Sequence, residues 1–321
     1  MESFLDCYFD DIFSKLERDC LLARYRRRQL VDYLNTLIMG CCRGEGCSVQ
    51  LGCARAVMAA LRYHASCMHN NGEVCMMGKY HNVLYVAAKL CFDWKLENRS
   101  IVCEVLQNMF RCERTLERLM IGAILGPHVT HVLSGWKSDY DSQKQNCLAL
   151  EYFLEHAAGE RLLFDCGTPT RLADVPMSSY CYTTPLRLAL QLGQPDTALL
   201  LLRYGARAAQ NTPVPVVIGN GQEITCLRYL LRGVPMAAVL PHPQKRKKQV
   251  GLWRDIIYYD EDSHVASFIP ESRRGNQPPQ LKHLCRCVLR KTLLENWQLP
   301  GGIADLPLPV SLQKYLDLVE D

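Results

Sequence analysis

Cysteine and histidine are the residues of this chain that are best suited to chemistry. The 321-residue sequence holds 17 cysteines and nine histidines. The densest group comprises Cys41, Cys42, Cys47, Cys53, His64, Cys67, His69 and Cys75. Structural zinc sites are built from close ligand pairs such as Cys-x2-Cys, repeated at a suitable distance. This group lacks such pairs, so reduced structural thiols are the favoured interpretation and zinc is the alternative. No metal or other cofactor is expected.

Catalytic motifs are also missing from the sequence. It contains no nucleophile elbow, phosphate-binding loop or His-Glu-x-x-His string. Gly219 and Gly221 form an isolated glycine pair that is typical of a turn. We therefore expect a non-catalytic protein with no catalytic or cofactor-binding residues.

The overall composition is that of an ordinary globular protein, with 48% hydrophobic and 22% charged residues. The formal net charge of +4 is too small to indicate nucleic-acid binding. The first residues, MESFLDCYFDD, are acidic where a signal peptide is basic, and no run of about 18 apolar residues predicts a membrane helix. These features favour a cytoplasmic protein with reduced cysteines and no membrane partner.

Two basic runs need a separate interpretation. Residues 245–248, Lys-Arg-Lys-Lys, lie between prolines and favour a solvated loop, with a nuclear import signal or a patch for an acidic partner as the alternatives. Residues 24–28 hold four arginines around Tyr25. On an amphipathic helix such a run is typical of the solvent-exposed face.

Residues 280–321 begin with the pattern of an amphipathic helix. Pro278 and Pro279 favour a helix start near Gln280. One apolar face is expected to consist of Leu281, Leu284, Cys285, Val288 and Leu289. The other side carries the cations Lys282, Arg286, Arg290 and Lys291.

A proline strip and a second helix follow. Gly301 and Gly302 predict a permissive turn. Pro307 and Pro309 exclude a helix, so residues 306–309 are expected to be extended and to present Leu306 and Leu308. Ser311 is the expected N-cap of a last helix that carries Leu312, Tyr315 and Leu316.

In this order the patterns closely resemble a SOCS box, a module that docks a chain onto a ubiquitin-ligase scaffold. The resemblance implies that elongin C, with elongin B, is bound through Leu281, Leu284, Cys285, Val288 and Leu289. It also implies that a cullin is bound through Ile303, Leu306, Pro307, Leu308, Pro309, Tyr315 and Leu316. The intact Leu-Pro-Leu-Pro string resembles the form that selects cullin-5.

Residues 184–204 carry the clearest pattern in the rest of the chain. Thr184 and Pro185 predict a tight turn into a helix that ends near Gly193, and residues 196–204 predict a second helix before Gly205. The stretch TPLRLALQLGQPDTALLLLRYGA is similar to the ankyrin-repeat consensus, except that Arg187 replaces the usual histidine. A single repeat cannot bury both its faces, so neighbouring repeats are expected.

Weaker helix pairs are expected at residues 82–88 with 101–110, 128–135 with 147–158, and 212–218 with 224–233. Residues 1–75 are expected to be helical, with one apolar stripe from Phe4 to Leu16 and another from Leu30 to Ile38. We favour a cap on the ankyrin stack for these helices over a separate recognition element. The proline-rich region after residue 236 is expected to be irregular and partly packed against the SOCS box, with residues 271–276 as a boundary.

The predicted organisation is an all-α chain. It comprises a helical cap (1–75), an ankyrin-repeat solenoid (76–236, clearest at 184–211), an irregular linker (237–279) and a three-helix SOCS box (280–321). The sequence resembles the ankyrin-repeat-and-SOCS-box family. That resemblance implies a substrate receptor of an elongin B/C, cullin-5 and RING-box ubiquitin ligase, which presents an unknown protein for ubiquitination and proteasomal degradation.

Two other functions remain open. An ankyrin scaffold that recruits no ligase would use the C-terminal residues as a packed cap. A nuclear regulator would use residues 245–248.

Overall fold

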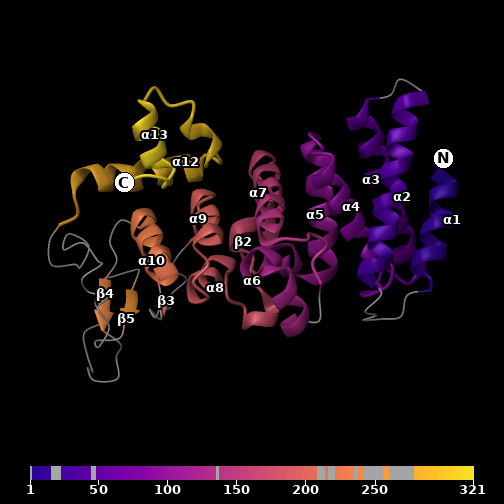
Figure 1. The fold of residues 1–321 in the computed structure, drawn as a ribbon, viewed down its shortest axis with the longest axis horizontal. Helices are drawn as coiled ribbons and strands as arrows, with labels where there is room; N and C mark the ends of the chain where they lie inside the picture. The colour runs from indigo at the N-terminus through magenta and orange to yellow at the C-terminus, as the bar shows by residue number, and fades with distance from the viewer. Residues whose placement is uncertain are drawn as a thin grey trace. The chain divides into compact units, whose positions relative to one another are not determined.

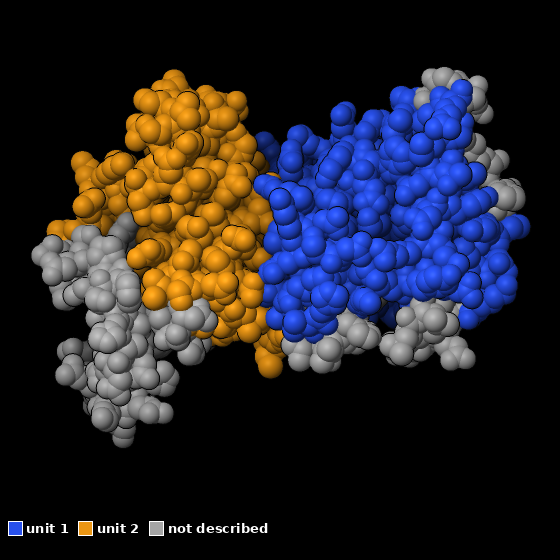
Figure 2. Space-filling view, in the orientation of Figure 1, with its two compact units in different colours: residues 1–169 blue, residues 170–321 orange. Residues whose placement is uncertain are grey.

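The computed structural model describes residues 2–15, 23–44, 48–134, 137–207, 214–215, 221–234, 238–241, 256–259 and 278–321. The chain divides into two compact units, Met1–Pro169 and Thr170–Asp321 (Figure 2). The basic run 245–248 and the predicted boundary 271–276 lie outside the described residues. None of the described helices is long and apolar enough to cross a membrane. The predicted domain boundaries stay a prediction.

The first unit begins with three helices, α1 (Glu2–Phe13), α2 (Ala23–Gly44) and α3 (Val49–Asn70) (Figure 1). Both predicted stripes place buried residues in the core, among them Phe9, Phe13, Leu30 and Leu34, while Leu16 lies outside the described residues. Helices α2 and α3 pack on α4, and the role of residues 1–75 as a cap stays a prediction.

The predicted pair at 82–88 and 101–110 is confirmed as α4 (Asn82–Asp93) and α5 (Arg99–Glu113). The side chain of Asn98 caps α5 by accepting a hydrogen bond from the backbone amide of Ile101. Helix α4 is buried along almost its whole length, because α2, α3 and α5 all pack against it.

The next pair consists of α6 (Glu117–Ser134) and α7 (Gln143–Gly159), which pack closely on each other. The sequence predicted the first helix only from residue 128, whereas it begins at Glu117. A kink explains the difference. Gly126 adopts a non-helical conformation with φ of 77°, and Pro127 follows it, so the helical pattern is broken in the middle.

The solvent-exposed face predicted for residues 24–28 is wrong at Arg27, which is fully buried on α2. Its guanidinium pairs with Asp139 at 2.9 Å and donates to Asn82 Oδ1 at 2.9 Å. A buried cation is tolerated here because a carboxylate and an amide oxygen replace its water.

Strands β1 (Leu163–Asp165) and β2 (Pro169–Arg171) pair in a small sheet, and 3-10 turns follow at η1 (Leu172–Asp174) and η2 (Ser178–Tyr180). The clear ankyrin repeat is confirmed as α8 (Pro185–Gln191) and α9 (Pro195–Arg203). Thr184 is the N-cap of α8, and Gly193 ends it with φ of +60°.

Helix α10 (Gly221–Gly233) packs on α9 and matches the second helix predicted for residues 224–233. The predicted first helix at 212–218 is wrong where the structure describes it. Val214–Pro215 is strand β3, since Pro215 has no amide hydrogen to donate within a helix. Strand β5 (Ile256–Tyr259) lies between β3 and β4 (Ala238–Pro241) in a parallel sheet, so the linker is not irregular throughout.

The C-terminal residues form α12 (Leu281–Glu295), η5 (Gly301–Ile303) and α13 (Val310–Leu316), which confirms three helices. Gly301 and Gly302 form the predicted turn as part of η5, although neither uses the left-handed backbone region. One local prediction is wrong. The N-cap of α13 is Pro309 rather than Ser311, because the helix begins at Val310. The all-α fold class is confirmed.

Candidate docking site on the C-terminal helices

Helix α12 exposes its predicted apolar face and buries part of its polar side, where Lys282 and Lys291 stay exposed. Leu281 is 76% exposed, Val288 63% and Leu289 40%; Cys285 is also exposed and Leu284 is half-buried. On the opposite side, His283, Arg286 and Arg290 are almost completely buried. The five residues predicted to bind elongin therefore form one continuous row on the surface, which we call the α12 stripe. An exposed aliphatic helix face of this kind can bind an apolar groove.

Arg290 explains why the polar face is buried. It donates to the carbonyl oxygen of Leu316 at 2.8 Å and to that of Leu202 at 2.6 Å. These carbonyls lie in the last turns of α13 and α9, where the helix dipole gives a negative partial charge. The carbonyl oxygen of Leu202 also accepts from the Gly205 amide at 2.9 Å. Burial lowers the pKa of Arg290 to about 10, so the side chain is still a cation at neutral pH.

Arg286 and His283 complete the buried face. Arg286 stacks on the Tyr315 ring at 4.1 Å and pairs with Asp321 at 3.3 Å. His283 Nε2 is 2.9 Å from the carbonyl oxygen of Val234, and its Nδ1 is 3.1 Å from Arg286 Nη2. Both ring nitrogens are satisfied when Nε2 carries the proton and Nδ1 accepts from the guanidinium.

Ion pairs join the last residues to the ankyrin-type helices of the same unit. Arg203 on α9 pairs with Asp317 at 2.8 Å, and Arg232 on α10 pairs with Asp321 at 2.9 Å. Arg232 also donates to the carbonyl oxygen of Leu318 at 2.9 Å. These polar contacts act together with apolar ones, such as Leu294 beside Gly205, and most of the α12 stripe stays exposed.

The residues predicted to bind a cullin divide into two groups. Ile303, Tyr315 and Leu316 are buried, and Ile303 and Leu316 form a small core with Leu293 and Leu299. Leu306 and Leu308 are half-buried and pack against this core, whereas Pro307 and Pro309 are exposed. The extended path predicted for residues 306–309 is wrong, because the Leu308 amide donates back to the Leu306 carbonyl at 2.7 Å and bends the strip.

Val310 is a surface residue that the sequence analysis missed. It is 67% exposed at the start of α13, beside the exposed Pro309. Its position in the sequence could have revealed this exposure. Val310 lies five and six places before the buried Tyr315 and Leu316, and residues at that spacing lie on different faces of a helix.

Comparisons with known proteins agree with these features. The SOCS box family model matches residues 277–317. Proteins named ankyrin repeat and SOCS box protein 17 from Canis lupus familiaris and Homo sapiens are each 30% identical over 187 residues, covering 52% of this chain and 59% of the relative. The Bos taurus protein is 30% identical over 154 residues, covering 42% of this chain and 49% of the relative.

The chain therefore matches little more than half the length of these curated relatives. No solved structure matches it. The resemblance to ankyrin repeat and SOCS box proteins, derived above from the residues, is confirmed.

Proposed function

We propose that this chain is a substrate receptor of a multi-subunit cullin-RING ubiquitin ligase. The observation that carries the proposal is the burial pattern of α12: Leu281, Val288 and Leu289 face solvent, while Arg286 and Arg290 are buried. A helix that only served the fold of this chain would bury Leu281 and Leu289 as it buries Leu293, because each buried leucine stabilises a fold by about 1.5–3 kcal/mol.

The α12 stripe is the proposed elongin-binding site. Leu281, Cys285 and Leu289 are spaced four residues apart on a regular helix, which suits recognition of a helix by a groove. The small side chain of Cys285 allows close approach at the middle of the row. Elongin C, carried with elongin B, is the partner that the SOCS box resemblance implies.

Cullin-5 with its RING-box protein is the proposed second partner. The exposed rings of Pro307 and Pro309 and the exposed Val310 offer a contact surface directly before α13. Ile303, Tyr315 and Leu316 would support this surface from the core rather than touch the cullin.

The ankyrin-type helices would bind the substrate protein, which is then ubiquitinated and degraded. In this role the chain contributes proximity between substrate lysines and the charged conjugating enzyme, and no chemistry of its own. We place this activity in the cytoplasm. The scaffold alternative requires the C-terminal helices to be a packed cap, and the exposed α12 stripe favours the receptor over it.

Co-purification with elongins B and C and with cullin-5 tests the proposal. Leu281→Ser combined with Cys285→Phe is expected to abolish elongin capture, because it removes one apolar contact and places a bulky ring at the middle of the row. Both residues are exposed, so we expect the fold to stay intact. Leu192→Ser with Cys181→Phe is the matched control, since it changes an exposed leucine and an exposed cysteine away from α12. Elongin capture by the first variant at the level of the control would contradict the assignment.

A narrower variant separates the cullin contact. Replacing all of residues 306–309 would disturb the core that Leu306 and Leu308 help to form. Pro307→Ala with Pro309→Ala changes only the exposed rings, so it is expected to weaken cullin-5 recruitment and to spare elongin binding. Loss of both partners together would argue against two separate contact surfaces.

A further inference from the structure

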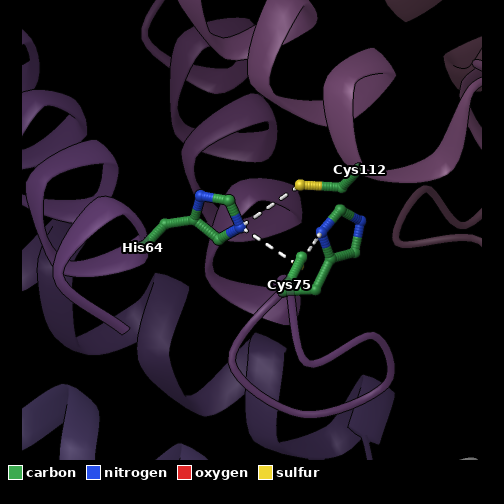
Figure 3. A group of neighbouring side chains, drawn as sticks. His64, Cys75 and Cys112 are labelled. Atoms are coloured by element: carbon green, nitrogen blue, oxygen red, sulfur yellow. Dashed lines mark hydrogen bonds between the residues drawn. The ribbon is translucent and has the colours of Figure 1, made fainter. Parts of the chain in front are cut away.

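Four possible metal ligands meet in the first unit, far along the chain from the C-terminal helices. His64 lies on α3, Cys75 in the loop between α3 and α4, His81 directly before α4, and Cys112 in the last turn of α5. One ligand atom of each residue lies within 4.8 Å of the other three. Figure 3 shows His64, Cys75 and Cys112 converging on one point. We propose that His64, Cys75, His81 and Cys112 form a structural zinc site.

Three of the distances between the ligand atoms match a tetrahedron, and all of them lie within 4.8 Å. Zinc bonds of about 2.0–2.3 Å place neighbouring nitrogen and sulfur ligands about 3.5 Å apart at tetrahedral angles. His64 Nε2 is 3.3 Å from Cys75 Sγ and 3.5 Å from Cys112 Sγ, and His81 Nδ1 is 3.5 Å from Cys75 Sγ. A single ion at the centre would bind all four atoms with little movement of the side chains.

The two imidazole rings are oriented for this role. Their centroids lie 5.9 Å apart with planes inclined by 66°, so each ring points a nitrogen at the thiols instead of stacking on the other ring. Thiols are weak hydrogen-bond donors and weak acceptors. Hydrogen bonding alone gives little stabilisation to such a group, whereas a metal ion would be held by strong bonds to all four residues.

His81 also has the outer partner that metal-binding histidines usually have. Its Nε2 lies 2.6 Å from Glu113 Oε1, and both side chains are buried. The Tyr85 hydroxyl also donates to Glu113, and Arg118 lies 3.8 Å from the same oxygen. The carboxylate therefore fixes the ring so that Nδ1 faces the cluster, which is the arrangement that strengthens a histidine ligand.

Charge and coordination indicate a structural ion rather than a catalytic one. Two thiolates and two neutral imidazoles neutralise a divalent zinc ion, so the complex carries no net charge into a largely buried site. All four positions are filled by protein, which leaves no place for a reacting water. The ion would connect the α3–α4 loop to the end of α5 and so hold the cap helices to the first ankyrin-type pair.

Metal analysis of the full-length chain, purified without chelators, is the first test. We expect about one zinc ion per chain by mass spectrometry. Replacement by cobalt should give the absorption of a tetrahedral thiolate complex, and removal by a strong chelator should lower Tm. Cys112→Ser should lose the metal. Cys67→Ser is the control: it changes a half-buried cysteine of α3 that lies outside the cluster, and it should retain the metal.

Glu113→Gln tests the outer partner, because it keeps the shape of the side chain and weakens its hold on His81. Chelator competition should show zinc affinity reduced by about tenfold or more. A wild-type chain with no zinc and no tetrahedral cobalt spectrum would overturn the proposal. So would a Cys75–Cys112 disulfide in freshly purified protein, or unchanged zinc in Cys112→Ser. If Cys112→Ser does not fold, the cobalt spectrum of the wild-type chain decides.

Discussion

Leu281→Ser should weaken elongin binding without weakening the fold. The side chain is 76% exposed, so the folded chain gains little from it. Burial of a whole leucine contributes about 1.5–3 kcal/mol, and about three quarters of that is still available to a partner. The expected loss on binding is thus about 1–2 kcal/mol, or roughly a 5- to 30-fold increase in Kd.

Leu293→Ser is the matched control on the same helix. Leu293 is buried in the core with Leu299, Ile303 and Leu316, so its truncation should destabilise the C-terminal helices by about 2–5 kcal/mol. An exposed substitution such as Leu281→Ser should change stability by less than about 0.5 kcal/mol. Comparing the two variants therefore distinguishes the loss of a contact with elongin from the destabilisation of the C-terminal helices.

Two measurements are needed on each variant. Titration calorimetry against the elongin B–elongin C complex gives Kd, and thermal unfolding of the chain alone gives Tm. The reasoning is refuted if Leu281→Ser lowers Tm as much as Leu293→Ser does, because the α12 stripe would then be packed on this chain. It is equally refuted if Leu281→Ser leaves Kd unchanged.

Two further predictions concern the rest of the fold. Gly205→Ala should cost about 1–3 kcal/mol in urea unfolding. Gly205 has φ of +77° and an added Cβ would lie 2.4 Å from Leu294 of α12, whereas Gly167→Ala, with φ of +86° and open space, should show backbone strain alone. His156 should make stability pH-dependent, because burial and Arg99 lower its folded pKa to about 4. Unfolded histidine binds a proton near pH 6.5, so stability is present above that pH and about 2 kcal/mol is lost at pH 5. Urea unfolding at pH 7.5 and pH 5 measures this loss, which should be smaller in His156→Gln than in the wild type. An equal loss of stability in the two proteins would contradict the role of His156.

The sequence predicted those parts of the fold whose signals are local. Thr184, Pro185 and Gly193 specify a cap, a first helical position and a helix end, and the structure has helix boundaries at or next to these residues. The all-α class and the C-terminal order of helix, proline strip and helix were predictable for the same reason. Where local signals conflict, as at Gly126 and Pro127 inside α6, prediction gave only part of the helix.

The metal cluster could not be predicted because its ligands are not paired along the sequence. Cys75 and His81 lie in and at the end of one loop, but His64 and Cys112 come from two different helices. Only the packing of α3 and α5 around α4 brings them together. In the sequence, His64 and Cys75 stand in a group with Cys67 and His69, which lie outside the cluster, and the lack of ligand pairs in that group favoured reduced thiols over zinc.

The buried arginines show why an amphipathic pattern leaves the orientation of a helix open. Periodicity separates two faces of α12, but a face is buried only if the neighbouring elements offer what it needs. Here the neighbours offer the carbonyl oxygens of Leu202 and Leu316, which are acceptors at the negative ends of two helices. Arg290 satisfies both, and Arg27 meets Asp139 and Asn82 in the same way.

This attachment has a consequence for function. If α12 were held to α9 by its leucines, elongin and the chain's own core would compete for the same residues, and binding would have to break the fold. Attachment through Arg290 and through the Arg203–Asp317 pair removes that competition. The helix is held in place by these polar contacts and by Leu294, which lies outside the stripe. Most of the α12 stripe is therefore available to the partner in advance, and little free energy is spent on ordering it when the partner binds.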